Sequence, residues 1–106
     1  MILTDAQGHL TIVNEAAEHM HGVKLLGISP SEYTADYSLL TDAEEIYPHG
    51  QLPLARAVRE KVNVHDALWK IRRGEGTVLR VRGNAKPIFH SDNSVIACVL
   101  TLAPYP

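Results

Sequence analysis

Six histidines in a chain of 106 residues raise the question of a metal site. Zinc sites draw their ligands from histidines and cysteines at short paired spacings. His19 and His21 are two positions apart within a predicted helix, so their side chains point to different faces. The remaining histidines show no paired spacing: His9, His49, His65 and His90. The pattern favours structural or surface histidines, and we predict no metal site.

Catalytic motifs are absent from the sequence. There is no G-x-S-x-G nucleophile elbow, and neither of the glycine-rich phosphate loops, G-x-x-x-x-G-K-S/T and G-x-G-x-x-G, occurs. Glu44 and Glu45 look like paired carboxylates, but adjacent side chains diverge and this stretch is polar. Cys98, the single cysteine, lies in an apolar run, where a thiol behaves as a small hydrophobic group. We therefore expect this chain not to be an enzyme.

The composition is that of an ordinary globular chain. Hydrophobic residues make up 45% of the sequence and charged residues 21%, and the length suits one domain, residues 1–106. No apolar run approaches the roughly 20 residues of a membrane-spanning helix, and no signal-peptide pattern is present. Together with the single cysteine, these features favour a cytoplasmic location without membrane contact.

Charge is distributed unevenly along the chain. Residues 1–50 contain eight acidic side chains and one basic one, whereas residues 70–86 contain six basic side chains and one acidic one. Such an uneven distribution of charge can orient a partner or a flanking segment. The isoelectric point of about 6.3 lies far below that of basic nucleic-acid-binding domains, so we expect solvated charged faces and no nucleic-acid partner.

The last third of the sequence predicts two long strands. Apolar or small residues alternate with polar ones over residues 79–87, the period of a half-buried strand. Residues 91–94 supply a turn in which Asn93 is best able to adopt a positive φ. The run from Val95 to Leu102 is apolar on both faces, so we expect the domain's helices to cover one face and a partner or a flanking segment to cover the other. The predicted partner face is Ile96, Cys98, Leu100 and Leu102.

The first part of the chain predicts a hairpin followed by a short helix. Ile2–Thr4 and His9–Val13 are β-prone segments on either side of a turn at Gly8. Asn14 is a good N-cap and Gly22 is placed to end the helix. The predicted buried stripe of this helix is Ala16, Ala17 and Met20.

The middle of the chain gives a weaker signal. Residues 23–50 are interrupted by glycine and proline, with one helical turn expected at Ser31–Asp36. A long irregular segment in a compact domain is usually functional or mobile, so we expect a binding pocket here. Gln51–Lys61 predicts a second helix and Val62–Arg72 a further strand. This order favours an α+β fold, a five-stranded antiparallel sheet with helices packed on one face.

These elements and several motifs resemble the PAS domain family over nearly the whole chain. The quoted motifs are Asp5-x-x-Gly8-x-Leu10-x-x-x-Asn14-x-Ala16-Ala17-Glu18, then Gly27, Pro30 and Tyr33, then PLARAV at Pro53–Val58, and the tail NAKPIFHSDNSVIACVLTL. PLARAV is similar to the long helix of one bacterial subgroup. The sequence departs from the family at residues 102–106, where an Asp-x-Thr often leads into a coiled coil, and at Glu75-Gly76, where Asp-Gly is usual.

The resemblance implies a sensory or dimerisation module of a larger bacterial signalling protein, a sensor histidine kinase of a two-component system. It implies a homodimer, an attached output domain and a small-molecule ligand held in a pocket between sheet and helices. The candidate lining residues are Tyr33, Tyr37, Tyr47, Leu54, Val58, Trp69, Leu79, Val81 and Ala85. The simpler interpretation is that these residues fill a solid core, in which Trp69 either plugs the core or stacks on a ligand.

The resemblance also leaves open a haem- or flavin-loaded redox or gas sensor. Some PAS relatives bind haem through a histidine near the long helix, which His49 and His65 flank in this sequence. A flavin photosensor of the light-oxygen-voltage type needs a reactive cysteine in an Asn-Cys-Arg-Phe-type helix, and that motif is absent. We therefore expect no cofactor, with haem or flavin as the alternative.

Overall fold

The structure is a computed structural model that describes residues 1–105. In chain order its strands, helices and 3₁₀ turns (η) are β1 (Ile2–Thr4), β2 (Leu10–Val13), α1 (Glu15–His21), η1 (Pro30–Glu32), α2 (Tyr33–Tyr37), β3 (Leu39–Leu40), η2 (His49–Gln51), α3 (Pro53–Glu60), β4 (Val64–Arg72), β5 (Val78–Phe89) and β6 (Val95–Pro104). Within this described range, none of the helices has the length and apolar character needed to cross a membrane.

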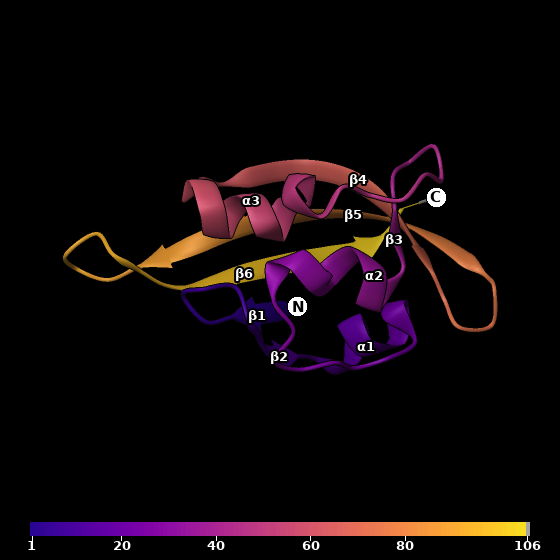
Figure 1. Cartoon of the computed structure of the whole chain (residues 1–106), viewed down its shortest axis with the longest axis horizontal. Helices are drawn as coiled ribbons and strands as arrows, with labels where there is room; N and C mark the ends of the chain where they lie inside the picture. The colour runs from indigo at the N-terminus through magenta and orange to yellow at the C-terminus, as the bar shows by residue number, and fades with distance from the viewer. Residues whose placement is uncertain (106) are drawn as a thin grey trace.

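All strands belong to one antiparallel sheet with the order β2-β1-β6-β5-β4-β3 (Figure 1). The single antiparallel sheet and the α+β class are confirmed. The predicted number of five strands is wrong, because the sheet has six. The additional strand is β3, which pairs Leu39 with Ile71 and Leu40 with Lys70 at the edge. Two residues are too few to leave a periodic pattern in the sequence.

Helix α1 begins and ends where the sequence predicts. The Asn14 side chain accepts a hydrogen bond of 3.0 Å from the backbone N–H of Ala17, and Gly22 ends the helix with a φ of 79°. Ala16, expected in the buried stripe, is exposed. His21 is buried in addition to Ala17 and Met20. Positions i and i+4 of a helix share one face, so His21 lies on the same face as Ala17.

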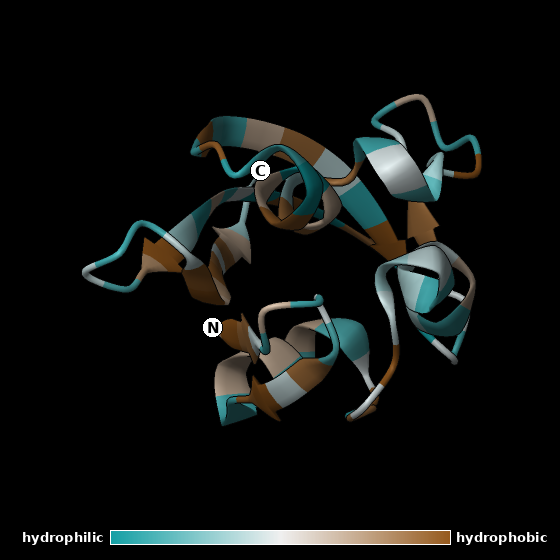
Figure 2. Cartoon of the chain, turned by 60° about the vertical axis from the view of Figure 1, so that its left-hand side comes forward, coloured by the Kyte–Doolittle hydropathy of each residue, from teal (hydrophilic) through white to brown (hydrophobic). Residues whose placement is uncertain are grey.

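The sheet is curved, and α3 packs against β4, β5 and β6 on its concave side (Figures 1 and 2). On β5 the predicted alternation is confirmed, since Val81, Gly83, Ala85 and Pro87 are buried and the residues between them are exposed. In Figure 2 the hydrophilic residues gather in the projecting turns. The long hairpin of β5 and β6 therefore forms the floor on which the helices lie.

The residues predicted as the partner face of β6 are Ile96, Cys98, Leu100 and Leu102. Ile96 is 50% exposed and Leu102 is half-buried, so the structure contradicts the prediction only for the other two. Cys98 and Leu100 are only 0% and 6% exposed, and they pair with buried residues of β5, so they belong to the core. The residues of β6 that point outward include Ala97 and Val99. A run that is apolar on both faces does not reveal which face the helices cover.

Trp69 on β4 fills the core, where only 2% of its surface is exposed. It lies beside Gly83 of β5, and a Cβ atom added to Gly83 would stand 2.7 Å from the Trp69 ring and 2.5 Å from the backbone oxygen of Thr101. A backbone atom cannot move aside as a flexible side chain can. Glycine at position 83 is therefore what allows the indole ring to approach β5 so closely.

We predict that Gly83→Ala destabilises the fold by about 1–3 kcal/mol, the usual cost of overpacking a tight core. Gly74→Ala is the matched control, because no atom lies within 4 Å of the Cβ it would add. Urea unfolding followed by tryptophan fluorescence measures both. A Gly83→Ala protein as stable as Gly74→Ala would contradict this account of the contact.

Candidate functional site

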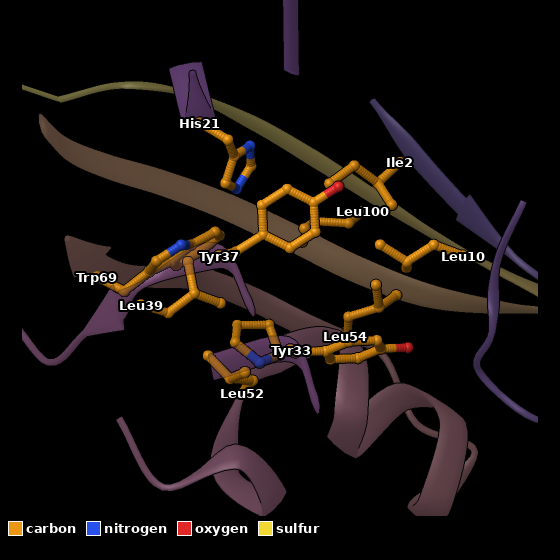
Figure 3. A pocket seen from close by; sticks show the side chains of 11 residues that line it. Ile2, Leu10, His21, Tyr33, Tyr37, Leu39, Leu52, Leu54, Trp69 and Leu100 are labelled. Atoms are coloured by element: carbon orange, nitrogen blue, oxygen red, sulfur yellow. The ribbon is translucent and has the colours of Figure 1, made fainter. Parts of the chain in front are cut away.

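A small apolar cavity lies between the concave side of the sheet and the helices (Figure 3). Its volume is about 30 Å³, enough for about one or two water molecules. Its lining residues are Ile2, Leu10, His21, Tyr33, Tyr37, Leu39, Leu52, Pro53, Leu54, Trp69 and Leu100. These residues come from both ends of the sheet and from all three α-helices.

The structure brings four of the nine candidate pocket residues together at this cavity: Tyr33, Tyr37, Leu54 and Trp69. Tyr47 lines a separate surface groove. The other four pack in or against the core without lining the cavity: Val58, Leu79, Val81 and Ala85. Four of the predicted residues are therefore correct. The predicted residues of β5 lie in the sheet beneath the helices and do not line the cavity.

Sequence reasoning missed seven lining residues: Ile2, Leu10, His21, Leu39, Leu52, Pro53 and Leu100. A signal for His21 was present, because it lies four positions after the buried Ala17 on one helix face. Ile2 and Leu100 lie on the cavity only because β1 pairs with β6, which places these two residues directly opposite each other. No local pattern predicts that pairing.

The hydroxyl groups of the two cavity tyrosines are occupied by backbone contacts. Tyr37 Oη donates to the Leu25 oxygen over 3.0 Å and accepts from the Leu25 N–H over 2.9 Å. Tyr33 Oη donates to the Gly8 oxygen. Burial raises the pKa of both phenols, so they stay neutral. Each tyrosine hydroxyl therefore bonds a loop to the core, and the tyrosine rings are what a ligand in the cavity would contact.

His21 is the titratable group in the cavity wall whose proton can change near neutral pH. It is 5% exposed, its Nδ1 lies 2.7 Å from the Ala17 oxygen, and its ring meets the Tyr37 ring edge-on at 4.6 Å. Burial lowers the pKa of His21 from its ordinary value. Nδ1 then carries the proton and donates to Ala17, which leaves the Nε2 lone pair as an acceptor.

The cavity does not fit a flavin or a haem. Sites for ligands of that size measure about 300–1,000 Å³, roughly tenfold or more the volume present. Cys98 is buried on β6, and burial raises the pKa of its thiol, which keeps it protonated. Of the histidines proposed for haem, His49 lines the surface groove and His65 is exposed on β4, so neither reaches the cavity.

A larger groove opens on the surface beside α2, with a volume of about 490 Å³. It is lined by Ser31, Thr34, Ala35, Ser38, Leu39, Leu40, Ile46, Tyr47, Pro48, His49 and Arg72. All but one of these residues come from the irregular middle of the chain, where the sequence predicted a pocket. Leu39 belongs to the walls of both the cavity and the groove.

No protein-family profile matches this sequence, and no curated protein does either. Solved structures do match. The dark structure of the blue-light photoreceptor Aureochrome1 LOV aligns with a TM-score of 0.72 at 14% identity, covering 99% of this chain and 74% of that one. A light-oxygen-voltage domain studied with a flavin analogue gives 0.71 at 9% identity, covering 99% and 76%.

The PAS-B domain of Drosophila melanogaster Cycle with bound glycerol aligns with a TM-score of 0.62 at 12% identity, covering 99% of this chain and 100% of that one. At such low identities these likenesses establish the fold. The chain therefore has the fold shared by PAS and LOV domains, as the sequence resemblance predicts.

We predict that Tyr37→Phe lowers the free energy of unfolding by about 1–3 kcal/mol, because the Leu25 N–H and oxygen both lose their partner. Tyr47→Phe is the control, since the Tyr47 hydroxyl makes no hydrogen bond within residues 1–105 and its removal should change stability by less than about 0.5 kcal/mol. Chemical unfolding of both variants, with amide exchange at Leu25, measures the difference. Equal stabilities would contradict the role of the Tyr37 hydroxyl in holding the Leu25 backbone.

We also predict that stability falls as pH drops through the ordinary histidine range. The buried His21 binds a proton less readily in the folded protein than in the unfolded chain, so the unfolded state takes up more protons on acidification. The free energy of unfolding at about pH 5.5 should therefore lie below that at about pH 7.5. His21→Phe should reduce this difference, whereas a His65→Gln control should retain it. An unchanged pH dependence in His21→Phe would refute the assignment.

Proposed function

We propose that the chain is a sensory or dimerisation module of a larger signalling protein, in which a small ligand in the cavity regulates an attached output. The observation that carries this proposal is the apolar cavity enclosed by the concave face of a PAS-type sheet and its helices. Close-packed protein cores contain few spaces larger than a water molecule. The PAS fold, shared with photoreceptor and PAS-B domains, supports the same proposal.

The cavity's chemistry limits the ligand to a small neutral molecule. The lining is almost wholly apolar, and both tyrosine hydroxyls are occupied. His21 offers a neutral acceptor at Nε2. An ion would lose its hydration with no opposite charge to compensate for it. A haem or flavin would require the helices to move away from the sheet, so the cavity volume favours a small molecule over the alternative of a cofactor-loaded sensor.

A second copy of the chain is the proposed partner on the outer face of the sheet. The strand register places Leu3 opposite both Ile12 and Val99, and Ile88 opposite Ala97, all on the outer face. Ile12 and Ile88 are 48% and 37% exposed. The outward residues thus form a mainly apolar face across four strands, interrupted by Lys86 opposite Val99. Pairing this face with that of a second copy buries the apolar residues of both.

Strand β6 links the two proposed contacts, because its neighbouring residues face opposite sides. Leu100 lines the cavity and Val99 lies in the outer patch. A ligand changes the output only if it binds the two arrangements of the module with different affinity. A shift of β6 on ligand binding supplies such a difference, since it moves both contacts together.

The finer identity of the parent protein rests on the sequence resemblance. PLARAV, now seen in α3, and the tail in β5 and β6 are similar to a bacterial PAS subgroup, which supports a cytoplasmic sensor histidine kinase of a two-component system. In that setting residues 1–106 are the input, and catalysis belongs to a separate output domain.

Native mass spectrometry of protein purified from its own host tests both the bound ligand and the dimer in one spectrum. We predict a dimer that carries a bound small molecule. The absorption spectrum of the same protein should show no visible band. Leu54→Phe fills the cavity and should remove the bound mass while leaving the dimer. Val99→Lys charges the outer patch and should give a monomer that keeps the bound mass. Each variant controls for the other, and a monomer without a bound molecule in the unmodified protein would overturn the proposal.

A further inference from the structure

The surface groove beside α2 contains a cation that the fold does not use. Within residues 1–105, Arg72 makes no hydrogen bond or ion pair through its side chain. The other arginines all have partners: Arg56 and Arg59 with Glu60, Arg73 with Glu75, Arg80 with Asp42, and Arg82 with Asp66. A planar guanidinium matches a carboxylate with two parallel hydrogen bonds.

Other potential hydrogen-bond donors line the groove together with Arg72. The hydroxyl of Ser38, the phenol of Tyr47 and the ring of His49 make no hydrogen bond within the described residues. Ser38 lies next to Arg72 in space, because the Arg72 N–H donates to the Ser38 oxygen over 3.0 Å. The groove wall thus offers several donors and a positive charge.

Two acidic side chains of the neighbouring loop are paired with cations. Glu44 lies 3.2 Å from the Lys70 ammonium, and Asp42 lies 2.8 Å from Arg80. These ion pairs hold the loop against β4 and β5. None of the residues that line the groove is acidic, so Arg72 gives its wall a positive charge. Charge complementarity therefore favours an anion.

The rest of the groove is apolar and uncovered. Ile46 is 79% exposed, which is a large exposure for a branched aliphatic side chain, and Leu40 and the half-buried Tyr47 continue the same wall. A volume of about 490 Å³ falls in the range of sites for single small molecules. A ligand that satisfies both ends needs an apolar body and one carboxylate.

A peptide strand cannot extend the sheet at this edge. The Tyr47 N–H donates to the Leu39 oxygen over 3.1 Å, and Leu40 is bridged to Ile46. The loop after β3 therefore already occupies the edge positions that strand addition would require. This favours a small molecule over a protein segment.

We propose that this groove binds a small amphipathic carboxylate, with the carboxylate on Arg72 and the apolar body against Ile46 and Tyr47. The groove site does not depend on the proposed function, although Leu39 lines both the groove and the cavity. It lies on the outside of the domain and opens to solvent, so it needs no movement of the helices.

Titration with phenylbutyrate, with phenylbutanol as its neutral counterpart, tests the proposal through amide NMR shifts. We expect the acid to bind about tenfold more tightly than the alcohol, as one charge-assisted contact predicts. The shifts should be centred on residues 38–49 and Arg72. Equal affinities, or shifts confined to cavity residues such as Trp69, would overturn the proposal.

Matched variants locate the charge and the apolar wall. Arg72→Gln should abolish the preference for the acid, whereas Lys86→Gln, an equal loss of charge on the outer face of β5, should keep it. Ile46→Ser should weaken acid and alcohol alike. Leu54→Phe, which fills the cavity, should bind the acid as the unmodified protein does. Retention of the preference in Arg72→Gln, or its loss in Lys86→Gln, would refute the role of Arg72.

Discussion

The structure depends on the pairing of β1 with β6. This contact joins residues almost a hundred positions apart, with Ile2 opposite Leu100 and Thr4 opposite Cys98. It closes the two β segments into one curved sheet, whose concave side the helices then cover. Because Ile2 and Leu100 both line the cavity, the same pairing creates the cavity wall. The entropy cost of bringing such distant segments together is repaid by the core that the closed sheet makes possible.

Two tyrosine hydroxyls fix the short helix α2 within the fold. Tyr33 and Tyr37 of the short helix α2 bond to Gly8 and Leu25, which belong to two different loops. A helix of this length has little stability of its own in water, so these contacts and the burial of the rings determine its position. The region that lines both the cavity and the groove is therefore the part of the fold with the least regular secondary structure, as is common for binding regions.

The sequence predicted those elements whose signals are local. The alternation in β5, the Asn14 cap and the positive φ of Asn93 follow from period, hydrogen bonding and turn preference, and the structure has all three. It could not predict β3, which exists only because β4 is beside it, or which face of β6 is buried. The partner face was therefore placed on the core side of Cys98, since an apolar strand has no polar face to mark the solvent.

The cavity and the groove share a wall, and this places a physical constraint on the two proposed ligands. Leu39 lines both spaces, is 8% exposed, and pairs with Ile71 of the sheet. A ligand that displaces Leu39 from one side changes the space available on the other. Thermodynamic linkage then requires the effect to be reciprocal: whatever factor one ligand imposes on the affinity of the other, the second imposes on the first. The two sites can therefore be independent in chemistry, as charge and size require, and still be coupled through a single side chain.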